Sequence, residues 1–231
     1  MSSNDVNVVL VHGAWADGSS WAKVIAPLAA DGIKVVAAPL PLTSFADDVA
    51  ALNRALERTS GPVVLAGHAY AGAVIAQTRD ERVKALVYIA ALAPDEGETV
   101  ADVFYRAKPR PKAPKLAPDS HLLIYLPEDA FGAAFAPNAP AEELAVLAAV
   151  QRPVSPACIT VPVARPLWKD RPAWFLVAEQ DRMIVQESQR FMAERMKAQV
   201  RSHPVDHTPI VTAPAAVVDI IREAIEAVAV R

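Results

Sequence analysis

The sequence is poor in cysteine, and this scarcity excludes two kinds of site. Its single cysteine, Cys158, cannot form an intramolecular disulfide or join a multi-cysteine zinc site, so we expect a buried thiol. No apolar run approaches the roughly 20 residues that cross a bilayer, and the polar start of the chain lacks the features of a signal peptide. These absences predict a cytoplasmic protein without a membrane partner.

The chain also lacks a large excess of charge of either sign. Its formal net charge is −3, and charged residues make up 21% of the 231 positions, so no feature favours nucleic acid as a partner. No cluster of metal-ligating residue types is present, and no Gly-x-Gly-x-x-Gly follows the first apolar run. We therefore expect neither a metal nor a dinucleotide cofactor. An apolar content of 53% predicts a globular protein.

Apolar runs alternate with helical patterns along most of the chain, and this alternation is typical of an α/β protein with a doubly wound, mostly parallel sheet. In such sheets ligands bind beyond the carboxyl ends of the strands. Continuous apolar runs predict strands that are buried on both faces. The expected strands cover residues 6–11, 33–38, 63–66, 82–91, 173–178 and 199–203.

Proline interrupts this alternation in the middle of the chain. Of the 20 prolines, 13 lie between Pro94 and Pro172. The basic, proline-rich segment 108–115 cannot be a regular helix or a central strand. We interpret it as a solvated linker in preference to a ligand for an SH3-type domain.

The helical patterns that follow this segment, near 130–135 and 141–150, are too short to build a core of their own. We therefore expect residues 95–170 to form a cap inserted over the site. The α/β core would then consist of residues 1–94 and 171–231. An exposed apolar surface on such a cap would also suit the face of a homodimer.

The turn at residues 67–72 has the pattern of a nucleophile elbow. An apolar run precedes the turn, a helical stretch follows it, and its letters are Gly-His-Ala-Tyr-Ala-Gly. Small residues on either side allow a strained nucleophile to sit at the top of a sheet. In the pattern Gly-x-Ser-x-Gly the middle residue is serine, but here it is Ala69, and Ala71 replaces the closing glycine.

Nucleophilic acyl transfer also needs a base that takes the proton of the nucleophile and an acid that orients the base. In enzymes with such an elbow the chain order is nucleophile, acid, histidine. The sequence offers this order as position 69, Asp181 and His207, because the last two follow the last two expected strands. Asp95 and Asp206 are alternatives for the acid.

Among the other histidines, His203 is an alternative base, while His12 and His68 suit structural roles in their loops. Donors for the oxyanion should come from the backbone N–H of Tyr70, directly after the elbow position, and from the loop after the first strand, where Ala14 is the best candidate. Six apolar residues are candidates for contact with substrate, although a core role suits each equally: Trp15, Tyr70, Leu122, Phe131, Phe135 and Trp168.

Five segments of the chain together resemble the α/β-hydrolase superfamily, and most closely its small bacterial esterase branch, related to plant methyl-ester esterases and hydroxynitrile lyases. The resemblance implies a Ser–His–Asp carboxylic ester hydrolase with no cofactor and a small, mostly apolar pocket. Carried over by position, it implies Asp181 as the acid, His207 as the base, and Ala14 and Tyr70 as oxyanion donors. The segments are residues 9–21, 67–72, 90–97, 178–184 and 207–214.

Two departures from this branch bear on the reaction. Its lyases carry threonine in the first loop and lysine after the histidine, where this chain has Gly13 and Thr208, which favours ester hydrolysis over cyanohydrin cleavage. Ala69 is the larger departure, since no acyl-enzyme can form without a hydroxyl. A triad that lacks a member retains only roughly 10³–10⁴-fold catalysis over water.

Two explanations of Ala69 remain open at this point. A serine was replaced to silence a working esterase, or the chain is a non-catalytic hydrolase homologue that binds a ligand as a receptor or scaffold. We favour the first, because Asp181 and His207 would have no hydrolytic task in a protein that only binds.

Overall fold

The computed structural model describes residues 5–230, and its described part contains one sheet of six parallel strands. The predicted doubly wound sheet is confirmed, and the strand ends differ from the expected ranges by at most two residues. In spatial order the strands are β2 (Lys34–Ala38), β1 (Asn7–Val11), β3 (Val63–His68), β4 (Val83–Ile89), β5 (Ala173–Ala178) and β6 (Gln199–His203).

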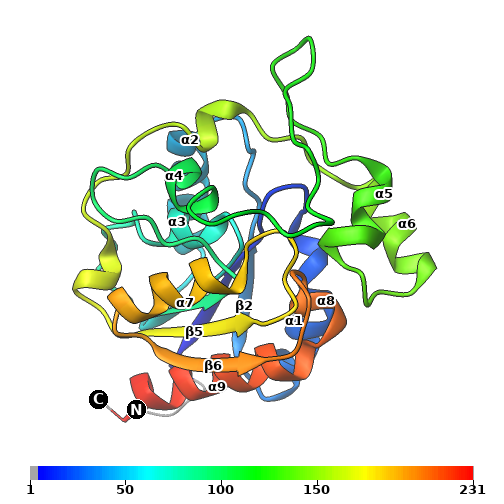
Figure 1. Cartoon of the computed structure of the whole chain (residues 1–231). Helices are drawn as coiled ribbons and strands as arrows, with labels where there is room; N and C mark the ends of the chain where they lie inside the picture. The colour runs from blue at the N-terminus through cyan, green and yellow to red at the C-terminus, as the bar shows by residue number, and fades with distance from the viewer. Residues whose placement is uncertain (1–4, 231) are drawn as a thin grey trace.

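Helices cover both faces of the sheet (Figure 1). Because both faces are covered, every residue of β1, β3 and β5 is buried, and this explains their continuous apolar sequences. None of the helices within residues 5–230 combines the length and apolar character needed to cross a bilayer. One face carries α1 (Ala22–Ala30) and α9 (Pro214–Ala229), and the other carries α2 (Phe45–Leu56), α3 (Ala71–Ile75) and α7 (Gln186–Arg195).

The order in which successive strands are added to the sheet reverses at β1. The chain pairs β1 with β2 on one side and with β3 on the other. The loops that follow β1 and β3 therefore diverge and flank a crevice at the carboxyl edge of the sheet, where doubly wound proteins bind ligands. The first-loop segment with Ala14 and the turn at Ala69 occupy these two positions.

Residues 95–170 lie between β4 and β5 and contain only short elements. The proline-rich segment 108–115 contains no helix or strand, and an isolated bridge joins Ile124 to Val154. The buried side chains of this insertion belong to the same hydrophobic cluster as the strands. Its elements are α4 (Val100–Phe104), α5 (Glu128–Ala130), the π-helical turn η3 (Phe131–Phe135), α6 (Ala141–Ala149), and the 3₁₀ turns η4 (Pro156–Cys158) and η5 (Leu167–Lys169).

Two fully buried histidines connect the loops at the carboxyl edge. His12 Nδ1 lies 2.9 Å from the carbonyl of Gly13, and His12 Nε2 accepts the backbone N–H of Leu40 at 2.9 Å. His68 Nε2 lies 2.7 Å from the carbonyl of His207. Burial lowers the pKa of His12 to about 4 and that of His68 to about 3, so both rings are neutral at pH 7.

Because the pKa values of these two histidines are low in the native state, we expect the protein to lose stability in mild acid. Their pKa values in the native state lie below the roughly 6.5 of an unfolded histidine, so the unfolded chain binds more protons as the pH falls. The stabilisation is complete above pH 6.5 and is lost below it. Each ring should lower the free energy of unfolding by about 1.4 kcal/mol per pH unit between pH 6.5 and its native pKa. Urea denaturation at a series of pH values measures this slope.

A matched pair of variants assigns the slope to its cause. His12→Gln removes one of the titrating rings and should reduce the slope by about 1.4 kcal/mol per pH unit. His121→Asn removes an exposed histidine and should leave the slope unchanged. An identical slope in both variants would contradict the assignment.

Candidate active site

Asp181 and His207 form a buried hydrogen-bonded pair. Asp181 follows β5, His207 lies in the loop after β6, and the two side chains meet because β5 and β6 are parallel neighbours. His207 Nδ1 lies 2.9 Å from Asp181 Oδ2, and the two residues are 2% and 0% exposed. The carboxylate therefore fixes the tautomer with the proton on Nδ1 and leaves Nε2 free to accept another.

The Asp181 carboxylate is itself fully hydrogen-bonded. Oδ1 accepts the backbone N–H groups of Met183 at 2.7 Å and Ile184 at 2.9 Å, and Oδ2 also accepts the amide of Gln189 at 2.9 Å. The Gln189 oxygen in turn accepts the backbone N–H of Ala178, at the end of β5. These donors hold the carboxylate in one orientation, and therefore also the imidazole bonded to it.

Ala69 occupies a strained turn between β3 and α3. Its φ of 50° is a left-handed conformation that a non-glycine residue rarely adopts. The turn is held by its own backbone, because the Ala69 N–H donates to Ile89 and the Ala69 carbonyl accepts from Leu92 and Gly72. The elbow geometry is thus present without its usual nucleophile.

Three glycines allow the close approaches that this elbow needs. A Cβ at Gly72 would lie 2.5 Å from the carbonyl oxygen of Leu92, and a Cβ at Gly67 would lie 3.0 Å from the backbone of Ala71. A Cβ at Gly13 would lie 3.0 Å from the methyl group of Ala69. The first loop therefore packs directly against the elbow, and a larger residue at position 13 would require one of the two to shift.

The two expected oxyanion donors lie on opposite sides of this contact. Ala14 follows Gly13 in the first loop, and Tyr70 follows Ala69 in the elbow. Within the described part of the chain, neither backbone N–H donates a hydrogen bond, and both residues line the same cavity. Both N–H groups are therefore without a partner among the described residues.

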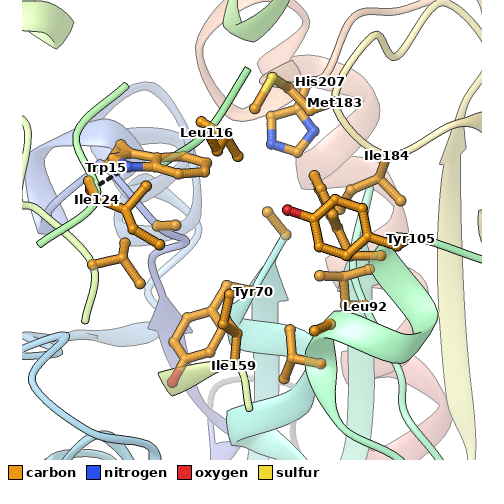
Figure 2. A pocket seen from close by; sticks show the side chains of 16 residues that line it. Trp15, Tyr70, Leu92, Tyr105, Leu116, Ile124, Ile159, Met183, Ile184 and His207 are labelled. Atoms are coloured by element: carbon orange, nitrogen blue, oxygen red, sulfur yellow. Dashed lines mark hydrogen bonds between the residues drawn. The ribbon is translucent and has the colours of Figure 1, made fainter. Parts of the chain in front are cut away.

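The cavity lies between the carboxyl edge of the sheet and the insertion. Figure 2 shows His207, Trp15, Tyr70 and Tyr105 around it. Most of its other lining side chains are aliphatic, so the polar atoms of the site are few. Such a site suits a small, mostly apolar molecule with one reactive polar group.

The cavity includes only some of the residues that the sequence suggested for substrate contact. Trp15 and Tyr70 line it. Four others do not: Leu122 is 68% exposed, Trp168 is buried in η5, and Phe131 and Phe135 are buried in η3. Phe135 supports the site from behind, because its ring packs 5.4 Å from that of His207.

The alternative acids and base lie elsewhere. Asp95 pairs with Lys169 at 2.5 Å. Asp206 is buried and accepts the backbone N–H of Asn138 in the insertion. His203 ends β6 and does not line the cavity. Geometry therefore favours the pair described above over each alternative.

A buried carboxylate, that of Asp48, lies behind the elbow and was not among the residues that the sequence singled out. Asp48 Oδ2 accepts the hydroxyl of Tyr70 at 2.7 Å, and Oδ1 accepts the backbone N–H of Leu42 at 2.8 Å. Burial raises the pKa of Asp48, and burial beside Asp48 raises the pKa of the Cys158 thiol to about 12. Asp48 lies in the first turn of α2, where acidic residues are common because they interact favourably with the helix dipole. Its position in the sequence therefore did not indicate a contact with Tyr70.

Within residues 5–230, no three side chains of histidine, cysteine, aspartate or glutamate gather in a way that could hold a metal ion. The buried Cys158 is a free thiol, as its isolation in the sequence predicts.

Comparison with known proteins places this arrangement in a family. Three solved structures superpose on nearly the whole chain, and at identities below 25% they show a common fold. They are a mutant of polyneuridine aldehyde esterase (17% identity, TM-score 0.80, 94% of this chain and 98% of that one), a pyrethroid hydrolase from Sphingobium faniae (21%, 0.78, 98% and 100%) and an extracellular alpha/beta-hydrolase from a Paenibacillus species (18%, 0.77, 95% and 98%).

No curated protein matches the sequence at a significant level. A family model described as the alpha/beta hydrolase family matches residues 8–220, which include the elbow, Asp181 and His207. Because this match spans nearly the whole chain and agrees with the fold, the chain belongs to the alpha/beta hydrolase family.

Proposed function

We propose that this chain has the site of a carboxylic ester hydrolase of the Ser–His–Asp type, specific for a small, largely apolar ester, with Ala69 in the position of the nucleophile. The buried Asp181–His207 pair, at a cavity that also contains the elbow, is the observation that carries the proposal. With alanine at position 69, the protein would bind an ester and leave it intact.

A serine at position 69 would complete the reaction. Its hydroxyl would attack the ester carbonyl while His207 Nε2 takes the proton, and Asp181 would stabilise the resulting imidazolium. The N–H groups of Ala14 and Tyr70 would hold the negative oxygen of the tetrahedral intermediate. As the intermediate collapses, the alcohol leaves with the proton from His207. Water, activated by the same imidazole, then releases the acid and regenerates the serine.

Two contacts support hydrolysis over the lyase chemistry of related enzymes. A Cβ at position 13 would lie 3.0 Å from the methyl group of Ala69, so a threonine there would require the first loop or the elbow to shift. Thr208, in place of a lysine, donates its hydroxyl to the carbonyl of Phe135 at 2.6 Å and serves to hold the loop. The site thus has neither the threonine nor the lysine that the lyases carry at positions 13 and 208.

A second candidate function is the binding of a ligand without chemistry, as in a receptor or scaffold. Ala69 itself favours this candidate, because the chain has no nucleophile at its elbow. The four hydrogen bonds to Asp181 favour the first candidate, since so costly an arrangement of a buried charge serves a base and has no evident task in binding an apolar ligand.

The substitution Ala69→Ser is expected to create esterase activity, because it restores the missing nucleophile to a site that is otherwise assembled. The rate constant for hydrolysis of 4-nitrophenyl acetate should rise by at least about 10³-fold over the chain with alanine. Stopped-flow absorbance should show a burst of 4-nitrophenol from acyl-enzyme formation.

The double variant Ala69→Ser, His207→Ala is the control and should return to the low rate of the alanine chain. If the single variant stays inert against a broad panel of esters, hydrolysis is rejected and the ligand-binding function takes its place.

In the serine-containing protein, Asp181→Asn should reduce kcat by roughly 10³–10⁴-fold, because an amide favours the wrong tautomer of His207. Asp95→Asn is the matched control: it removes the rival carboxylate and should change kcat little, since Asp95 pairs with Lys169 away from the cavity. The same ester assay measures both. An equal loss in the two variants would contradict the assignment of Asp181 as the acid.

A further inference from the structure

Two hollows meet beneath the proline-rich part of the insertion. The first is the cavity at Ala69, and the second lies under residues 107–116, which we call the strap. The two hollows adjoin, because four residues line both of them: Phe104, Tyr105, Leu116 and Met183.

Tyr105 is the polar group at this boundary. Two other polar side chains of the cavity are already engaged, because the Trp15 indole donates to the carbonyl of Ile124 at 2.9 Å and the Tyr70 hydroxyl donates to Asp48. The Tyr105 hydroxyl bonds to no group in the described part of the chain, and Figure 2 shows its oxygen directed into the cavity. It is therefore a hydrogen-bond donor available to a ligand.

The backbone around Tyr105 is held in place while its hydroxyl stays free. The Tyr105 N–H donates to the carbonyl of Ala101 at 2.9 Å at the end of α4. The Phe104 ring packs edge-on against Tyr105 at 4.9 Å, and the guanidinium of Arg106 stacks 3.6 Å above the ring of Phe191. These contacts hold the chain on both sides of Tyr105, whose own side chain is 59% exposed.

We propose that the second hollow is a subsite for the distal part of an elongated ester, with Tyr105 as the residue that selects it. This inference rests on the proposed function. The ester carbonyl lies at Ala69, and the chain of the ligand extends along the residues that the two hollows share. An acceptor oxygen near the middle of the ligand receives the Tyr105 hydroxyl, and the far end lies under the strap. Lys115 lines the second hollow, so a cationic far end is disfavoured.

The test measures equilibrium binding to the chain that carries Ala69, which leaves esters uncleaved. Three probes are compared by titration calorimetry: methyl benzoate, 2-phenoxyethyl benzoate, and 3-phenylpropyl benzoate, which replaces the ether oxygen by a methylene group. Filling the second hollow by Ala113→Phe should weaken binding of both long esters roughly tenfold and leave methyl benzoate unchanged.

Ala117→Phe is the matched control, because Ala117 is exposed just beyond the strap and lines neither hollow. This variant should bind all three esters as the parent does. Equal affinities for the long esters in the parent and in Ala113→Phe, or no binding of either long ester to the parent, would overturn the subsite.

Tyr105→Phe tests the donor separately. It should weaken binding of 2-phenoxyethyl benzoate roughly tenfold and leave 3-phenylpropyl benzoate unchanged, because only the ether oxygen loses a partner. Tyr125→Phe removes a half-exposed tyrosine of the insertion that lines neither hollow and should change neither affinity. An equal loss for both esters, or no loss for the ether, would reject the role of Tyr105.

These binding results are independent of hydrolysis. If Ala69→Ser proves inert while the long esters still show the predicted selectivity, the proposed function fails and the subsite stands. If Ala69→Ser hydrolyses esters but Ala113→Phe does not discriminate between short and long ones, the subsite fails alone.

Discussion

The hydrogen bond between His207 and Asp181 is the interaction on which the site depends. It joins two loops that leave neighbouring parallel strands, and it is buried, so it requires both partners to be present and correctly oriented. The donors around Asp181 supply that orientation from the loop after β5 and from α7. The pairing of β5 with β6 thus brings the loops of Asp181 and His207 together.

A second constraint acts at the elbow. The positive φ of Ala69 and the close approaches at Gly67 and Gly72 bring α3 tightly against the end of β3. Gly13 then allows the first loop to touch the elbow, which brings Ala14 and Tyr70 to the same cavity. A strained turn of this kind persists only where the surrounding structure holds it, so the elbow is preserved although its residue carries no hydroxyl.

The insertion completes the site without a core of its own. Its buried side chains join the hydrophobic cluster of the sheet, and Phe135 and Thr208 connect it to the loop of His207. The same insertion contributes α4 and the strap, which supply residues that line both the cavity and the second hollow. The core would thus supply the reacting groups, and the insertion would supply the shape that selects a ligand.

The sequence by itself determined the sheet, because continuous apolar runs at regular spacing are buried strands wherever helices cover both faces. It also determined the elbow, since its small residues and their setting are local features. Only the tertiary structure decided which of Asp95, Asp181 and Asp206 meets His207, and that Asp48 supports Tyr70. It also decided that Trp15 lines the cavity while Phe131, Phe135 and Trp168 do not. Such contacts join residues far apart in the chain, and apolar character alone does not tell a side chain that packs in a core from one that lines a cavity.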